Sequence, residues 1–131
     1  MVWGMIWKGG RSELIIMERD PTSPRGGYST KSYIWALEEG LIPNYEGGRF
    51  FLQDNARIHT SRAAQAWFLE NNIWVQDHPA HSPDLNPIEH VWKAMKAILH
   101  RKYPDLHLLK DNEADIAVVK ATLKDAWVAI P

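Results

Sequence analysis

Cysteine is absent from the 131-residue sequence, and this limits the kinds of site that the chain can build. Without thiols, neither a disulfide framework nor a thiolate zinc site can form. No apolar run approaches the roughly 20 residues that a membrane-spanning helix needs. The apolar N-terminus MVWGMIWKGG has neither a basic region ahead of it nor a small-residue cleavage site, so it is not a signal peptide. These absences fit an intracellular protein with no membrane partner.

An excess of positive charge is also missing. The formal net charge is −1 and the sequence pI is about 6.6. A free-standing nucleic-acid-binding domain usually carries a basic excess that neutralises phosphates. Any contact with DNA must therefore come from a local patch, from metal ions, or from a part outside these residues. The seven tryptophans lie mostly in apolar-periodic segments, where core packing explains them better than base stacking.

Strand and helix patterns alternate along the chain. The apolar runs VWGMIWK and SELIIMER flank the glycine-rich GGR and predict a β-hairpin. Short buried strands are predicted at RFFLQ and IWVQDH. Helical patterns occupy residues 29–42 and 60–72, a segment from Pro87 to Leu99, and a last segment in which Ile116, Val119, Leu123 and Trp127 are in phase. This order predicts one domain over residues 1–131 with an α/β layer fold.

Two acidic residues stand where functional groups often gather in such folds. Asp54 directly follows the RFFLQ strand, and functional groups collect at the carboxyl ends of strands in α/β sheets. Glu89 lies in the first turn of the helix that begins at Pro87, and 34 residues (55–88) separate it from Asp54. Carboxylates from distant segments can together bind Mg²⁺, because hard cations prefer oxygen ligands. Two-metal phosphoryl transfer generally uses three or more such acids.

Structural roles explain the same acids. Asp54-Asn55 after a strand is a common turn signal, in which the Asp side chain bonds its own backbone. Glu89 stands three residues after Asn86, the expected N-cap, so it can instead complete a capping box. The spacing alone favours these structural roles over a metal site.

The histidines and lysines near the acids also have two interpretations. Three histidines are candidate metal ligands: His59, His81 and His90. Their spacing matches no tight zinc pattern, so surface or core positions explain them better. Lys93, Lys96 and His100 share the side of the helix that carries Glu89 and could contact DNA phosphates. A solvated flank with an i,i+4 pair between Glu89 and Lys93 explains them equally well.

The segments VWGMI, FLQDNARIHT and WFLENNIWVQDHPAHSPDLNPIEHVWKAMK resemble the catalytic domain of transposases of the mariner superfamily. The similarity covers about residues 2–100. Its motifs QDNA-x-x-H and SPDLNPIE, with 34 residues between the acids, are highly specific together. The resemblance implies a ribonuclease-H-like three-layer fold, a mixed sheet with helices on both faces. The resemblance outweighs the structural roles given above for Asp54 and Glu89.

The resemblance also implies a site and its partners. Asp54 and Glu89 correspond to the second and third of three catalytic acids, which hold Mg²⁺ or Mn²⁺, whereas Asp84 in the SPDLNP loop is not a ligand. The partners implied are the DNA of the transposon ends and of the target, and the implied location is the nucleus. Lys93, Lys96 and His59 are the candidate DNA contacts.

One acid of the family is unaccounted for. The first catalytic Asp of the family lies on the first, central strand, upstream of the VWG strand, and this chain begins immediately before VWG. No Asp precedes Asp20, which follows the second arm of the hairpin. The expectation is a partial catalytic domain without that strand and without the family's N-terminal helix-turn-helix region. Metal binding and strand cleavage by this chain alone should then be impaired, and residues 101–131 are expected to form a helical extension.

Loss of the central strand has consequences for the sheet. The VWG and FFLQD strands would pair with each other, leave an exposed edge that favours a homodimer, or fold poorly. The alternative function is a non-catalytic DNA- or protein-binding domain retained from a transposon.

Overall fold

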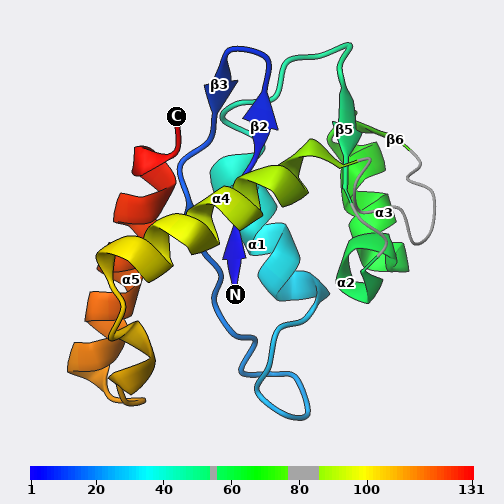
Figure 1. The fold of residues 1–131 in the computed structure, drawn as a ribbon. Coiled ribbons are helices and arrows are strands. Elements are labelled where there is room, and N and C mark those ends of the chain that lie inside the picture. Colours follow the sequence, from blue (N-terminus) through cyan, green and yellow to red (C-terminus); the bar gives the residue numbers. More distant parts are fainter. Residues whose placement is uncertain (54–55, 77–85) are drawn as a thin grey trace. The chain divides into compact units, whose positions relative to one another are not determined.

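The computed structural model describes residues 1–53, 56–76 and 86–131. The chain divides into two compact units, Met1–Asn86 and Pro87–Pro131. The elements follow in this order (Figure 1): β1 (Val2–Trp3), β2 (Ile6–Trp7), β3 (Gly10–Arg11), β4 (Ile15–Ile16), α1 (Thr30–Gly40), β5 (Phe50–Leu52), α2 (Arg57–Thr60), α3 (Arg62–Glu70), β6 (Trp74–Gln76), α4 (Pro87–Lys102), the 3₁₀ turn η2 (Leu106–Leu108) and α5 (Glu113–Ala129). None of the helices in the described ranges is both long and apolar enough to span a bilayer.

The predicted N-terminal hairpin is present and is built in two short pieces. β1 pairs with β4 and β2 pairs with β3, both antiparallel. Between the pieces, the Ser12 N–H donates to the Met5 carbonyl at 2.8 Å, and the Met5 N–H donates to Ser12 Oγ at 2.9 Å. The turn falls at Lys8 and Gly9, where Gly9 has φ +90° in the left-handed region that glycine adopts without strain. Gly10 therefore belongs to a strand and not to the turn.

Helix α1 begins after Ser29, as the sequence predicts, and ends at Gly40, two residues before the end of the predicted helical pattern. Ser29 is the N-cap: its hydroxyl accepts from the Lys31 N–H at 3.1 Å, and its own N–H donates to Ser32 Oγ at 3.2 Å, which makes a reciprocal capping box. The buried positions Tyr33, Ala36, Leu37 and Gly40 repeat at helical spacing and form the inward face. Pro43 follows just past the end.

The strands β5 and β6 form a parallel pair connected through α2 and α3. Phe51 lies opposite Val75 and Phe50 lies opposite Trp74. Phe51 is buried against Phe68 of α3, with ring centroids 5.7 Å apart, whereas Phe50 and Trp74 are 66% and 55% exposed. Figure 1 shows α3 beside this pair. The pair thus has one face packed on the core and one exposed face.

The core of the first unit joins the hairpin, α1, the β5–β6 pair and α3. Its buried members are Trp3, Met17, Tyr33, Ala36, Leu37, Leu41, Phe51, Ala64, Trp67, Phe68 and Ile73. Ala64, Trp67 and Phe68 form the buried face of α3. Ser61 caps α3 by accepting from the Ala64 N–H at 3.3 Å.

The mixed α/β class is confirmed, but the arrangement of strands differs from the single mixed sheet that the resemblance implies. The described residues form three separate two-stranded sheets, β1–β4, β2–β3 and β5–β6. Among them, the VWG strand pairs only with β4 and the FFLQD strand only with β6, so the two do not pair with each other. Within the described ranges, each of these strands therefore pairs with one other strand.

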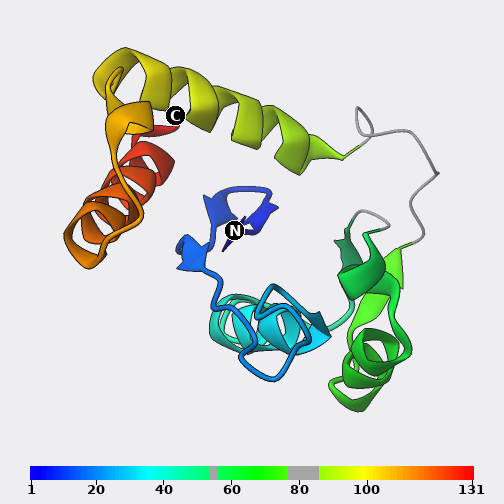
Figure 2. The same cartoon turned by 90° about the horizontal axis from the view of Figure 1, so that it is seen from below.

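The second unit is a pair of helices. On α4, Met95 and Ile98 are buried, which confirms the predicted apolar stripe. The rings of Trp92 and Trp127 lie 5.4 Å apart between centroids, and Tyr103 Oη donates to Asp125 Oδ2 at 2.7 Å. Figure 2 shows α5 returning beside α4. Residues 101 and 102 complete α4, and α5 occupies most of the segment after η2.

Candidate functional site

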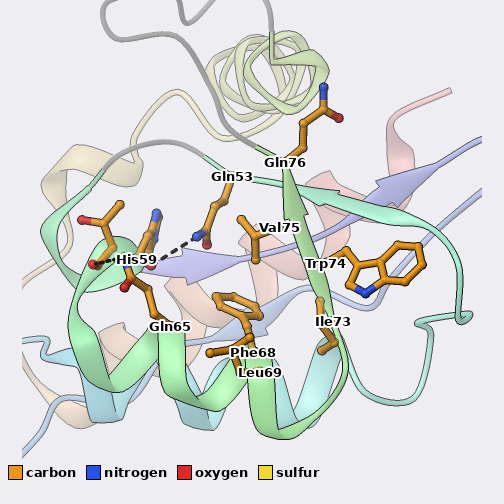
Figure 3. A pocket seen from close by; sticks show the side chains of 10 residues that line it. Gln53, His59, Gln65, Phe68, Leu69, Ile73, Trp74, Val75 and Gln76 are labelled. Carbon is orange, nitrogen blue, oxygen red and sulfur yellow. Dashed lines mark hydrogen bonds between the residues drawn. The ribbon is translucent and has the colours of Figure 1, made fainter.

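Of the predicted site around Asp54, the structure describes the strand β5, which leads to it. Asp54 and Asn55 lie outside the described residues, and Gln53 directly precedes them. The Gln53 side chain is fixed at both ends: Oε1 accepts a hydrogen bond from Tyr33 Oη, and Nε2 donates to the His59 carbonyl at 3.1 Å. These partners belong to α1 and α2, so both helices are bonded to the residue that follows β5. Figure 3 shows the hydrogen bond between Gln53 and His59.

The ring of His59 completes this cluster. It lies against the ring of Tyr33, with centroids 4.2 Å apart and planes tilted by 34°. Tyr33 is only 1% exposed, and His59 is half-buried. His59 therefore has a packing role, and its predicted contact with DNA stays a prediction.

An open cavity of about 470 Å³ lies beside the cluster. Figure 3 shows Gln53, His59 and Gln65 on one side of it, with Phe68 and Val75 behind them. None of the ten described residues that line it is Asp, Glu, Lys or Arg. These described residues offer amide, hydroxyl and imidazole groups and no carboxylate, so by themselves they do not form a site for a hard cation.

Glu89 lies in the first turn of α4 and is half-buried. An acid in the first turn interacts favourably with the helix dipole, so this position has a structural benefit of its own. Lys93 and Lys96 follow at helical spacing on the same side and are exposed. Within the described part of the chain, no ion pair joins Glu89 to Lys93, so the predicted i,i+4 pair is not formed.

The meeting of Asp54 and Glu89 stays a prediction. Asp54 lies outside the described residues, and Glu89 belongs to the second unit. His81 and Asp84 also lie outside the described residues, and His90 is exposed. Considering only described residues, no group of three or more His, Cys, Asp or Glu side chains could hold a metal ion. The half-buried carboxylate of Glu89 nevertheless supplies the oxygen donors that Mg²⁺ prefers.

Asp20 has a structural role in the loop that leads to α1. It is 4% exposed, and its Oδ1 accepts from both the N–H and the hydroxyl of Thr22, at 2.9 and 2.6 Å. Its Oδ2 accepts from the hydroxyl of Ser29, the N-cap of α1, at 2.7 Å. The hydrogen bonds from Thr22 and then Ser29 lower the pKa of Asp20. The carboxylate thus ties the preceding loop to α1.

Residue patterns do not identify Tyr33 and Gln53 as site residues. Tyr33 stands at an apolar position of the helical pattern at residues 29–42, although a buried tyrosine needs a partner for its hydroxyl. That partner, Gln53, lies 20 residues away and is the residue before the candidate acid. The position of Gln53 within FLQDN was the available signal.

Comparison with known proteins places the chain among transposases. Residues 24–110 match the family model described as DDE superfamily endonuclease. The chain is 32% identical to the transposable element Tc1 transposase of Caenorhabditis elegans over 133 residues, which cover 100% of this chain and 44% of that protein. It is 38% identical to the Tc3 transposase of the same organism over 84 residues, 62% of this chain and 22% of that protein. It is 35% identical to the Tcb2 transposase of Caenorhabditis briggsae over 81 residues, 62% of this chain and 26% of that protein. The chain thus spans less than half the length of these relatives.

Proposed function

We propose a function from the premise that this chain belongs to the DDE superfamily endonuclease family, among the mariner-like transposases: residues 1–131 form part of a DNA transposase catalytic domain. The observation that carries the proposal is the family match over residues 24–110, because it spans both Asp54 and Glu89. The mixed α/β architecture supports a ribonuclease-H-like domain. Among the described residues, β1 and β5 each pair with one strand, so each could accept a further strand.

Asp54 and Glu89 would hold the divalent cation, Mg²⁺ or Mn²⁺. Asp54 follows Gln53, the first residue after β5, and Glu89 presents a half-buried carboxylate from the first turn of α4. When bound, such ions supply activation of the attacking oxygen and stabilisation of charge on the phosphodiester. The two acids contribute fixed oxygen ligands, and α4 gives Glu89 a rigid base.

The DNA contacts would come from side chains near these acids. Lys93 and Lys96 are exposed on the side of α4 that carries Glu89, where they can neutralise phosphates. His59 is the third proposed contact, because its half-buried ring lines the open cavity beside Gln53. We also propose nuclear location, where a transposase meets its DNA, and localisation of the fluorescently tagged gene product tests it.

A polypeptide of these 131 residues supplies two of the three acids, so it should not cleave DNA by itself. The test is a plasmid-nicking assay with Mg²⁺ or Mn²⁺ on this polypeptide and on a chimera. In the chimera, the part of the Tc1 transposase that precedes the aligned segment is fused ahead of Met1. We expect nicking only by the chimera, and its loss in Asp54→Asn and Glu89→Gln. A chimera that nicks equally well after Asp54→Asn or after Glu89→Gln would contradict the proposal.

The second candidate function is a non-catalytic binding domain that assembles as a homodimer. The separate two-stranded sheets favour it, because the described strands β1 and β5 each leave an edge without a strand partner. Sedimentation and gel-shift measurements on the same polypeptide test this candidate. A concentration-dependent dimer, or salt-sensitive DNA binding by the nicking-inactive polypeptide, would support it. A monomer that binds no DNA would exclude it.

A further inference from the structure

We propose that Lys31, Arg57 and Arg62 form a cationic surface on the first unit that binds the phosphate backbone of duplex DNA. The inference rests on the proposed function, because it takes DNA to be the partner of the chain. It requires neither the cation site nor Lys93 and Lys96, which belong to the second unit. Because the net charge of the whole chain is −1, DNA binding by these residues depends on local patches of this kind.

The three cations lie on helices that meet at their first turns. Lys31 is in the first turn of α1, and Arg62 is the first residue of α3. The residues just before them, Thr30 and Ser61, share a hydrogen bond between their hydroxyls at 2.9 Å. Arg57 begins α2, which contacts both α1 and α3. Figures 1 and 2 both show the start of α1 beside α2.

The positive charge of this surface is not neutralised by the helices that carry it. All three cations are exposed, and within the described ranges none of them forms an ion pair. The acids of α1 and α3 lie at the far ends of these helices. They are Glu38 and Glu39 near the end of α1, and Glu70, the last residue of α3. Both helices are therefore polarised, with their cations at the ends that meet.

The stability of the fold does not explain this arrangement. A helix dipole favours acids in the first turn and bases in the last turn, and both α1 and α3 have the reverse. The N-caps are the neutral residues Ser29 and Ser61, which leave the added charge in place. Residues that oppose a local structural rule without a compensating gain are expected at functional sites. A phosphate would gain from the charges of both side chains.

Lys31 has one contact that offers a structural explanation for it. Its Nζ lies 3.5 Å from Thr22 Oγ1, at the limit of a hydrogen bond. The hydrogen bonds from Thr22 and Ser29 lower the pKa of Asp20 more than the charge of Lys31 does. Asp20 is 4% exposed, so it is not presented to a partner in solution. Arg62 takes no part in these contacts and therefore gives the cleaner test.

Two kinds of polyanion, DNA and an acidic protein, could bind a cationic surface. The match of residues 24–110 to an endonuclease family favours DNA, and it includes all three cations. Duplex DNA presents closely spaced phosphates, so cations on adjoining helices can contact more than one of them. Arginine also binds a phosphate through two parallel N–H groups, which suits Arg57 and Arg62.

The test measures the binding of a fluorescein-labelled DNA duplex by fluorescence anisotropy over a salt series, using the 131-residue chain in EDTA. Lys31→Gln/Arg62→Gln removes two charges from the cationic surface. Lys8→Gln/Arg49→Gln is the matched control, because it removes one lysine and one arginine from exposed positions in the β2–β3 turn and just before β5.

Lys31→Gln/Arg62→Gln should reduce the slope of log K against log salt concentration by about 1.8, because each lost phosphate contact contributes about 0.9. At about 0.1 M salt, its affinity for the duplex should be at least about tenfold lower than that of wild type. The control should keep the wild-type slope, and its affinity should stay within about twofold of wild type.

Urea denaturation separates DNA binding from folding. Because the two cations oppose the helix dipoles, Lys31→Gln/Arg62→Gln should be at least as stable as wild type. If this variant is less stable or fails to fold, Arg62→Gln alone decides, since it keeps the contact between Lys31 and Thr22. Arg62→Gln should lower the salt slope by about 0.9, and an unchanged slope would overturn the inference.

The remaining outcomes separate the partners and the two proposals. An equal loss in the Lys8→Gln/Arg49→Gln control, or no binding of the duplex by wild type, overturns the inference. Labelled polyglutamate is the second probe, and an equal loss of affinity for it would show that DNA is the wrong partner. EDTA removes divalent cations from the binding assay, so the proposed function is judged separately by nicking. If the chimera nicks DNA but Lys31→Gln/Arg62→Gln binds the duplex normally, the proposed function stands and this inference is wrong.

Discussion

Gly40 near the end of α1 lies against the indole of Trp3, so close that a Cβ at residue 40 would stand 2.3 Å from the ring. A second ring atom would be 2.8 Å away, and Ile15 Cγ1 would be 3.1 Å away. Trp3 is 8% exposed and cannot easily move aside. The absence of a side chain at residue 40 is therefore what allows the hairpin to pack on α1.

Gly40→Ala should lower the free energy of unfolding. The contact with Trp3 costs about 1–3 kcal/mol of overpacking. The higher helix propensity of alanine offsets about 1 kcal/mol of this overpacking cost. We expect a net loss of up to about 2 kcal/mol in urea denaturation. Gly47→Ala is the control, because a Cβ there meets no atom within 4 Å. Equal stability of the two variants would contradict this packing.

The carboxylate of Asp20 should make stability depend on pH in the acid range. Hydrogen bonds from Thr22 and Ser29, with the charge of Lys31, lower the pKa of Asp20 in the folded chain. In the unfolded chain, the pKa of Asp is about 3.9. The stabilisation is therefore fully present well above that value and is lost as the pH falls through the lower, folded pKa.

The measurement compares wild type with Asp20→Asn between pH 2 and pH 7, from the urea midpoint. Wild type should be more stable above about pH 5, and the difference should shrink steadily below about pH 4. Asp111→Asn, at an exposed residue, controls for the loss of a surface charge. A difference that stays constant over the whole range would show that Asp20 contributes nothing as a charged group.

Lys93 and Lys96 should account for part of any affinity for DNA. Both are exposed on α4, so replacing them with Gln leaves the fold unchanged. Each lost phosphate contact should reduce the slope of log K against log salt concentration by about 0.9. Fluorescence anisotropy on a DNA duplex over a salt series measures this slope. The control variant Lys120→Gln/Lys124→Gln removes the same charge from α5. An equal reduction of the salt slope in this control would show that Lys93 and Lys96 attract DNA only nonspecifically.

Much of the fold follows from local chemistry, and the sequence predicts it. Ser29 and Ser61 cap α1 and α3 because their hydroxyls accept from the first helical N–H groups, and the apolar periods identify the inward faces. The hairpin follows from two apolar runs around glycine. The short helix α2 was missed because its four residues carry no apolar period.

The arrangement of the strands could not be predicted in the same way. Whether β1 pairs with β4 or with a strand far along the chain depends on long-range contacts that residue patterns do not encode. The Tyr33–Gln53 hydrogen bond is of this kind, since it joins a helix face to a strand end. For the site, family motifs identified Asp54 and Glu89, but local chemistry explains each acid equally well without a metal. Only a measurement of both acids together distinguishes the two explanations.

The most direct test of the shared cation site is therefore a double-variant cycle on Mn²⁺ affinity. The four proteins are wild type, Asp54→Asn, Glu89→Gln and the double variant, and EPR of free Mn²⁺ gives each affinity. If both acids hold the same ion, each single change should weaken binding at least tenfold, and the double variant should bind scarcely more weakly than either single one. Single variants that keep wild-type affinity, or effects that multiply independently, would show that Asp54 and Glu89 do not form one site.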